Sequence, residues 1–147
     1  FEPMFHEIIQ KNVNQNTLKN SVTVHPYGLS SKNSTINIYR PQIQDGNKTN
    51  YGGYSMTLSE NHLDDSDIVN IKRLDAVYNG TPSVIKVDIE GHEEEFLKGA
   101  ENIIKKHKPV LLIEIHDHEM DKMFPIIKNF GFKTVYQRPE KVFTCTW

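Results

Sequence analysis

The sequence has a single cysteine, Cys145, and no apolar stretch long enough to cross a membrane. One cysteine excludes a disulfide within the chain and a cysteine-rich zinc site. The longest apolar run, PVLLIEI, has the length of a β-strand, whereas a membrane-spanning helix needs about 18 or more apolar residues. We therefore expect no membrane span, and a reducing compartment such as the cytoplasm is the location that fits best.

An excess of positive charge is also missing. Lys and Arg number 17 and Asp and Glu number 19, so the formal net charge is −2. A nucleic-acid-binding surface needs clustered Lys and Arg, so we do not expect nucleic acid as a partner. The content of 37% hydrophobic and 24% charged residues is typical of a globular protein, and 147 residues suit one domain with one core.

The first half of the chain predicts one helix, several strands and a long loop. FEPMFHEIIQKNV places apolar residues at helical spacing, with Pro3 suited to a first turn. SVTVHPYGLSS alternates at Val22 and Val24 and predicts a short strand, as do STINIYR and DIVNIKRLDAV. Residues 41–67 are rich in Asn, Gly, Asp and Ser, which predicts a long mobile loop of the kind that is often functional.

The second half alternates strands with helices. SVIKVDI and PVLLIEIH predict buried strands. One amphipathic helix is predicted from the apolar face formed by Phe96, Leu97, Ala100, Ile103 and Ile104. A second helix follows, in which Pro125 must cause a kink or sit in the first turn. GFKTVYQ and KVFTCTW, joined around RPE, predict a closing hairpin, so we expect an α/β fold with a mostly parallel sheet and one antiparallel last strand.

Acidic residues gather where the strand VIKVDI ends and the next helix begins. Glu93, Glu94 and Glu95 are explained by the dipole of that helix, because a solvated first turn favours acids by about 0.3–1 kcal/mol each. Asp88 is different, since it directly follows Val87 and is expected to be only partly solvated. Such a carboxylate requires a cation, a hydrogen-bond donor or a metal beside it.

A second polar cluster, EIHDHE, ends the neighbouring predicted strand. Glu114, His116 and His118 lie on one side of an extended chain by their period of two. Two histidines and carboxylates are metal-ligand types, but without a third histidine nearby a polar loop is the better interpretation, and we predict no metal site. His116 is better suited to be a general base, because an imidazole titrates near neutral pH.

A third signal is FEP at the start. An acid that follows a strand end and leads into a helix, as Glu2 does here, can accept hydrogen bonds from ribose hydroxyls in nucleotide-type sites. Any helix also tolerates an early Glu, so this feature gains meaning only together with the others.

The segments FEP, HPYGLSS, IKRLD, IKVDIEGHEEEFLKGA and KPVLLIEIH, in this order, resemble the FkbM family of S-adenosylmethionine-dependent methyltransferases. The resemblance covers nearly the whole chain, and the block KVDIEGHE…LKGA is its most specific part. It implies the Rossmann-like fold of class I methyltransferases, with a seven-stranded sheet whose last strand is antiparallel. It also implies O-methylation of a hydroxyl on a sugar, a glycolipid or a secondary metabolite, so the expected partner is a small molecule or glycan acceptor.

The resemblance assigns four residues to the cofactor. It implies that Glu2 binds the ribose of S-adenosylmethionine and that Gly28 and Leu29 lie against the adenine. Asp88 is expected beside the methionine end of the cofactor and the reacting hydroxyl.

Further residues are implied on the acceptor side. Glu90 and Glu114 would face the acceptor, and Tyr54 and Ser55 of YGGYS would belong to a loop that covers the site. His116 or His92 is our candidate general base, with Asp88 orienting that base or the hydroxyl. A bound divalent cation that lowers the pKa of the hydroxyl is an alternative route.

The sequence departs from the family in one respect. Such methyltransferases have a first strand and a glycine-rich turn before FEP, and none of the eight glycines here forms a G-x-G after a strand. We therefore expect residues 1–147 to be a single methyltransferase domain that lacks the first strand and that turn, and to bind S-adenosylmethionine more weakly than a longer form.

Two other functions remain open from the sequence. The chain fits a non-catalytic, truncated methyltransferase-like binding module, and an upstream strand followed by G-x-G would argue against that alternative. An NAD-dependent enzyme of similar sheet architecture is the second rival, but VDIEGHE has no role there.

Overall fold

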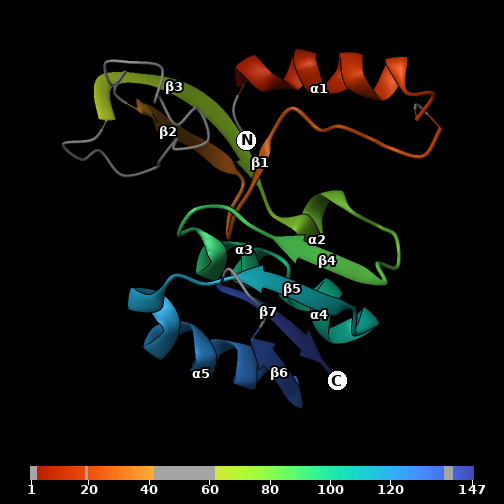
Figure 1. The fold of residues 1–147 in the computed structure, drawn as a ribbon, viewed down its shortest axis with the longest axis vertical. Helices are drawn as coiled ribbons and strands as arrows, with labels where there is room; N and C mark the ends of the chain where they lie inside the picture. Colours follow the sequence, from red (N-terminus) through yellow and green to blue (C-terminus); the bar gives the residue numbers. More distant parts are fainter. Residues whose placement is uncertain (1–2, 19, 42–61, 138–140) are drawn as a thin grey trace. The chain divides into compact units, whose positions relative to one another are not determined.

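The computed structural model describes residues 3–18, 20–41, 62–137 and 141–147 (Figure 1). The chain forms two compact units, which we describe separately. Unit 1 comprises Phe1–Gly28 and Asn33–Ile71, and unit 2 comprises Leu29–Lys32 and Lys72–Trp147. The candidate site described below lies in unit 2.

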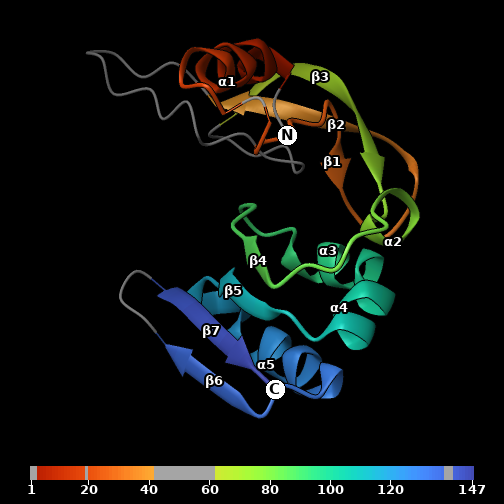
Figure 2. The same cartoon turned by 90° about the vertical axis from the view of Figure 1, so that its right-hand side faces the viewer.

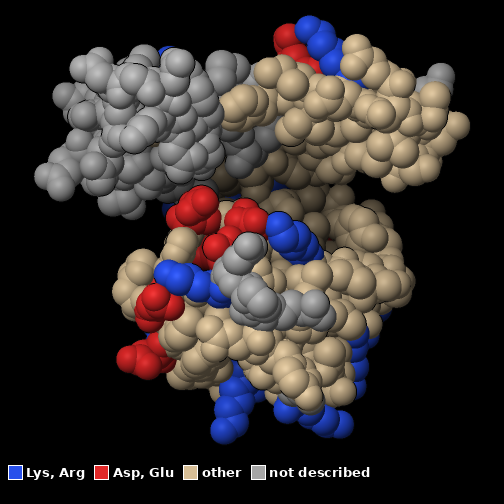
Figure 3. Space-filling view, in the orientation of Figure 1, with Lys and Arg blue, Asp and Glu red and all other residues tan. Residues whose placement is uncertain are grey.

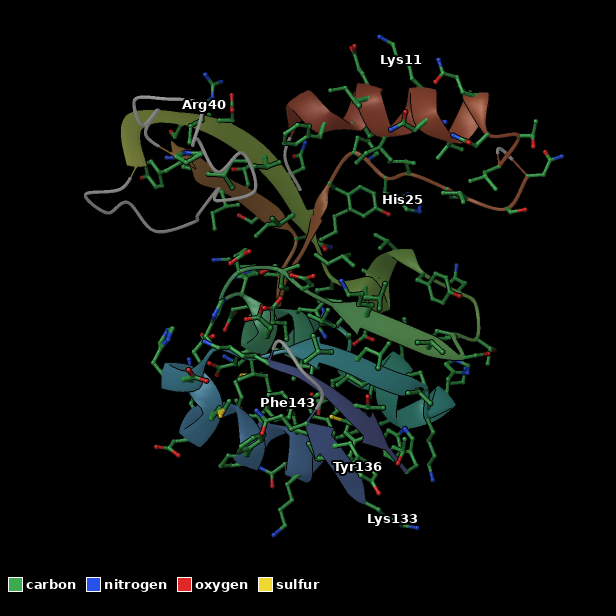
Figure 4. The ribbon with its side chains drawn as sticks, viewed as in Figure 1. Lys11, His25, Arg40, Lys133, Tyr136 and Phe143 are labelled. Carbon is green, nitrogen blue, oxygen red and sulfur yellow. The ribbon has the colours of Figure 1, made fainter. Side chains whose placement is uncertain are left out.

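Unit 1 contains a helix and most of a small sheet. The elements are α1 (Pro3–Gln15), β2 (Ser34–Pro41) and β3 (His62–Lys72), with β1 (Gly28–Leu29) at the boundary of the two units. The strand order is β1-β3-β2, and β2 pairs antiparallel with β3. The guanidinium of Arg40 donates hydrogen bonds of 3.1 and 2.9 Å to the two carboxylate oxygens of Asp67, which joins the two strands (Figure 4).

Two predictions for this unit are wrong. The strand predicted at Val22 and Val24 does not form, and the extended segment is limited to Gly28 and Leu29. Val22 is 39% exposed, so its alternation does not mark a buried face. The predicted loop ends too late, because β3 already begins at His62. The polar residue Asp67 fits in this strand because Arg40 of β2 pairs with it across the ladder. Residues 42–61 of that loop lie outside the described residues.

Unit 2 is a four-stranded sheet with helices. The strands are β4 (Val84–Val87), β5 (Val110–Glu114), β6 (Thr134–Gln137) and β7 (Val142–Thr146). The helices are α2 (Leu74–Val77), α3 (Glu93–Gly99), α4 (Glu101–His107), η1 (Asp117–Glu119) and α5 (Met120–Phe130). The strand order is β4-β5-β7-β6. Figure 2 shows α3, α4 and α5 along one face of this sheet.

The core of unit 2 lies between that sheet face and the helices. Its fully buried side chains come from both layers and include Leu97, Ile104, Leu111, Ile113 and Ile127. Burying each such side chain stabilises the fold by about 1.5–3 kcal/mol. Phe143 of β7 belongs to this core, whereas Tyr136 of β6 is exposed (Figure 4).

The α/β class, the closing hairpin and the antiparallel last strand are confirmed. β7 pairs antiparallel with both β5 and β6. The prediction of a mostly parallel sheet is wrong for the described strands of this unit. Among them β4 and β5 pair in parallel, whereas β5 with β7 and β6 with β7 pair antiparallel. The reason is that the hairpin inserts β7 between β5 and β6, which turns the remaining pairs antiparallel.

Three local predictions also change. Val84 at the start of β4 is 56% exposed, because β4 lies at the edge of the four described strands of this sheet, and only Val87 is fully buried. The single helix predicted after it is two, α3 and α4, which meet at Ala100 with a non-helical backbone. Pro125 lies inside α5 rather than in its first turn.

Candidate functional site

Two carboxyl groups meet where β4 and β5 end. The strands are parallel, and Val87 lies opposite Ile113 in their register, so Asp88 and Glu114 follow at the same edge of the sheet. Each of the two side chains shifts the pKa of the other, downward for Asp88 and upward for Glu114. Figure 3 shows acidic side chains gathered on this part of unit 2. The expectation that charge concentrates at the carboxyl ends of the strands is therefore confirmed for these two residues.

Lys86 supplies the cation that Asp88 requires. Its Nζ donates a 2.7 Å hydrogen bond to Oδ2 of Asp88. This bond, followed by a hydrogen bond that Asp88 accepts from Glu114, lowers the pKa of Asp88, while the same interaction with Asp88 raises the pKa of Glu114. Asp88 is thus the member of the pair that keeps its charge, and Glu114 is the member that binds a proton more readily.

His116 and Glu90 complete this group. His116 Nε2 lies 3.6 Å from Oε2 of Glu90, and the imidazole stacks on His118 with ring centroids 5.8 Å apart. The charge of His116 also lowers the pKa of both Asp88 and Glu114. We refer to Asp88, Glu90, Glu114 and His116 as the carboxylate cluster. Its members are partly exposed, so a ligand in solvent can reach them.

His92 has different surroundings. Its Nε2 lies 2.9 Å from the hydroxyl Oγ of Ser30, and it begins the turn into α3. Burial lowers the pKa of His92, because the charged imidazolium loses water there. The side chain is therefore neutral at neutral pH, and its observed partner is a serine hydroxyl rather than a member of the carboxylate cluster.

The three acids at the start of α3 do not share one environment. Glu94 and Glu95 are partly exposed and pair with Lys98, as a solvated first turn predicts. Glu93 contradicts that prediction, because it is only 3% exposed. Its Oε1 accepts hydrogen bonds of 3.3 Å from the backbone N–H groups of Ile89 and Gly91. The sequence analysis did not predict that Glu93 is buried and accepts backbone hydrogen bonds. The one signal in the sequence was the position of this acid two residues after Gly91, in a turn from a strand to a helix.

The other predicted site residues are only partly described. Glu2, Tyr54 and Ser55 lie outside the described residues. Gly28 and Leu29 form β1 and are half-buried, and Leu29 packs against the core of unit 2. Their assigned roles in binding the adenine stay predictions.

The described residues contain neither a metal-binding cluster nor a membrane-spanning helix. Within residues 3–18, 20–41, 62–137 and 141–147, no three His, Cys, Asp or Glu side chains are arranged to hold a metal ion. Over the same ranges, no helix is both long and apolar enough to cross a membrane.

Comparison with protein families decides the relationship of the chain. The model of the methyltransferase FkbM domain matches residues 1–134. The chain belongs to the FkbM methyltransferase family. A comparison with curated proteins finds no match.

A solved structure supports the same fold for this FkbM family chain. The crystal structure of methyltransferase FkbM from Methylobacillus flagellatus KT superposes with a TM-score of 0.67 at 18% sequence identity. The superposition covers 99% of this chain and 34% of that chain, so the present chain spans about a third of the length of its structural relative. At this identity the likeness establishes the α/β fold alone.

The chemistry of the carboxylate cluster suits a positively charged group. The hydrogen bond with Asp88, followed by burial and then by the charges of Asp88 and Glu90, raises the pKa of Glu114. A positively charged ligand stabilises such a group by direct attraction.

Proposed function

We propose that this chain carries acceptor-side and donor-binding residues of an S-adenosylmethionine-dependent O-methyltransferase with a Rossmann-like fold. The acceptor is a hydroxyl on a sugar, a glycolipid or a secondary metabolite. The observation that supports this most directly is the meeting of Asp88 and Glu114 at the carboxyl ends of two parallel strands. In open α/β sheets, ligands bind at that edge.

The cofactor, when bound, supplies an electrophilic methyl group on a sulfonium. Asp88 is the group proposed to hold the positively charged methionine end, because Lys86 keeps its carboxylate ionised. Glu114, which binds a proton more readily, is suited to hydrogen-bond the acceptor hydroxyl and orient it.

His116 is the proposed general base. A sugar or polyol hydroxyl is a weak nucleophile at neutral pH, and a positioned base contributes roughly 10²–10⁴-fold to its reaction. Nε2 of His116 would accept the hydroxyl proton, and Glu90, 3.6 Å away, would stabilise the imidazolium that forms. His92 ranks second, because the bond to Ser30 engages its Nε2 and its lowered pKa makes it the weaker base.

Methyl transfer to a panel of hydroxyl acceptors tests this assignment. We expect Asp88→Asn and His116→Ala to lower kcat roughly 10²-fold or more, and His92→Ala to lower it less. His107→Ala, on α4, is the matched control and should retain full turnover. Unchanged turnover in both Asp88→Asn and His116→Ala would refute the assignment, and cofactor binding without any transfer would favour a binding module.

A further inference from the structure

Glu93 is a charged residue in an unexpected place. Together with Ser30 it is one of the two buried polar residues among those that the structure describes, and it is 3% exposed. Acidic side chains are almost never fully buried unless a partner compensates the lost water. The burial of Glu93 therefore needs a reason beyond the dipole of α3.

The contacts of Glu93 identify what it holds. Its Oε1 accepts hydrogen bonds from the backbone N–H groups of Ile89 and Gly91, both at 3.3 Å. Between these two amides lies Glu90. Its φ of +55° is in the left-handed region of backbone conformation, which residues other than glycine rarely adopt. Gly91 follows with a φ of +93°. Glu93 thus bonds to both sides of a strained residue.

A second acid packs under the same turn. A Cβ on Gly91 would lie 3.7 Å from Oε1 of Glu119, which belongs to η1. Oε2 of Glu93 and Oε2 of Glu119 are both buried without a hydrogen-bond partner in the described part of the chain. Burial raises the pKa of Glu93, and the charge of Glu119 adds to that rise. The segment that follows β5 therefore brings a second carboxylate near Glu93 and the turn that Glu93 holds.

We propose that Glu93 is a positioning residue that fixes the turn between Asp88 and His92. Through its bonds to Ile89 and Gly91 it sets where the carboxylates of Asp88 and Glu90 stand relative to Glu114 and His116. The consequence for catalysis rests on the proposed methyltransferase function. The consequence for the geometry of the turn does not, so the two can be tested apart.

The test compares Glu93→Ala with Glu93→Gln. The alanine variant loses the acceptor, whereas glutamine keeps a carbonyl oxygen at the same place. In Glu93→Ala we expect amide hydrogen exchange at Ile89 and Gly91 to become about tenfold faster or more. Exchange at Leu111 in β5 should keep its wild-type rate, and Glu93→Gln should behave as wild type at all three amides.

A second readout reports on the carboxylate cluster itself. Carboxyl ¹³C NMR titration follows the coupled pair Asp88 and Glu114, whose pKa values depend on their mutual hydrogen bond. We expect Glu93→Ala to change this titration and Glu93→Gln to restore it. Glu94→Ala is the matched control, because Glu94 begins the same helix but pairs with Lys98 and Lys122 at the surface.

Three outcomes would overturn the proposal. The first is wild-type exchange and titration in Glu93→Ala. The second is equal loss in Glu93→Gln, since the acceptor oxygen would then not matter. The third is faster exchange throughout β5, which would make Glu93 a general packing residue. Absence of methyl transfer in the wild-type protein would count against the proposed function alone, because exchange and titration decide the role of Glu93 independently.

Discussion

Asp88 and Glu114 favour different protonation states, because the pKa of Asp88 is lowered and the pKa of Glu114 is raised. Two carboxyl groups in hydrogen-bond contact repel one another when both are ionised, so one of them retains a proton more strongly. Lys86 decides which, because its bond to Asp88 lowers the pKa of that group while the pKa of Glu114 rises. Lys86 on β4, two residues before Asp88, thus determines that Asp88 is the charged member of the pair and that Glu114 is the member that holds a proton more readily.

Replacing Lys86 with Met tests this assignment. We expect the pKa of Asp88 to rise in Lys86→Met, because the largest cause of its lowering is removed. In the wild type, the stabilising contribution of Asp88 is present above its ordinary pKa of 3.8 and is lost as the pH falls through the lowered folded value. In Lys86→Met, this stabilising contribution should be lost at a higher pH than in the wild type. The fall in the rate of methyl transfer at low pH should move in the same direction. Carboxyl ¹³C NMR titration measures the shift directly.

Lys105→Met is the control for that variant. Lys105 is similarly exposed and pairs with Glu101 on α4, so its removal should leave the titration of Asp88 unchanged. An unchanged Asp88 titration in Lys86→Met would show that Lys86 does not control the pair.

At the residue level, the sequence predicted the meeting of Asp88, Glu114 and His116 but not the role of Glu93. Strand ends can be located from apolar runs, and parallel pairing then brings their first polar residues together. The burial of Glu93 depends on how η1 and α3 pack under the turn, which no local pattern encodes. His92 was expected at the acceptor side, whereas the structure shows it beside Ser30.

At the scale of elements, α3 packs tightly against the segment Leu29–Lys32. A Cβ added to Gly99 would lie 1.9 Å from the carbonyl oxygen of Ser30, so a side chain there requires the backbone to move. The same approach brings Ser30 to His92 and Ser31 to Glu95, which accepts a hydrogen bond from the Ser31 hydroxyl. Gly99 is therefore needed for the packing that holds the beginning of α3 in place.

Gly99→Ala tests this packing, because two effects oppose one another. Alanine is favoured over glycine in a helix by up to about 1 kcal/mol, whereas overpacking against a backbone typically costs about 1–3 kcal/mol. We expect the overpacking to win and the free energy of unfolding, measured in urea, to fall.

Gly80→Ala is the matched comparison. Its added Cβ meets only the exposed side chain of Tyr78, which can rotate away, so the change in stability should stay within about 0.5 kcal/mol. Equal losses in the two variants, or a gain in Gly99→Ala, would contradict the packing account.

Periodicity predicted the elements of unit 2 better than their ends and pairings. The helix face from Phe96 to Ile104 was found, but the non-helical backbone at Ala100 divides it into α3 and α4. The hairpin of β6 and β7 was found because two alternating segments flank a short polar turn. The position of this hairpin next to β5, at the edge of the sheet, was not predicted. Alternation of apolar residues contains no information on which strand lies beside which.

At the scale of the whole molecule, the sequence indicated the FkbM family and the α/β class, and both are confirmed. The division into two compact units was not predicted, since the sequence shows no recognisable linker at their boundaries. A single methyltransferase domain over residues 1–147 remains a prediction. The central claim at this scale is that the carboxylate cluster of unit 2 receives the methyl donor.

Amide chemical-shift mapping with S-adenosylmethionine tests that claim most directly, because it detects even weak binding. We expect the largest shifts to fall on residues 88–92 and 114–118. We also expect S-adenosylhomocysteine, which lacks the sulfonium charge, to bind less tightly to the same residues. Shifts that leave both segments unchanged at saturating S-adenosylmethionine, or that concentrate elsewhere in the chain, would contradict that claim.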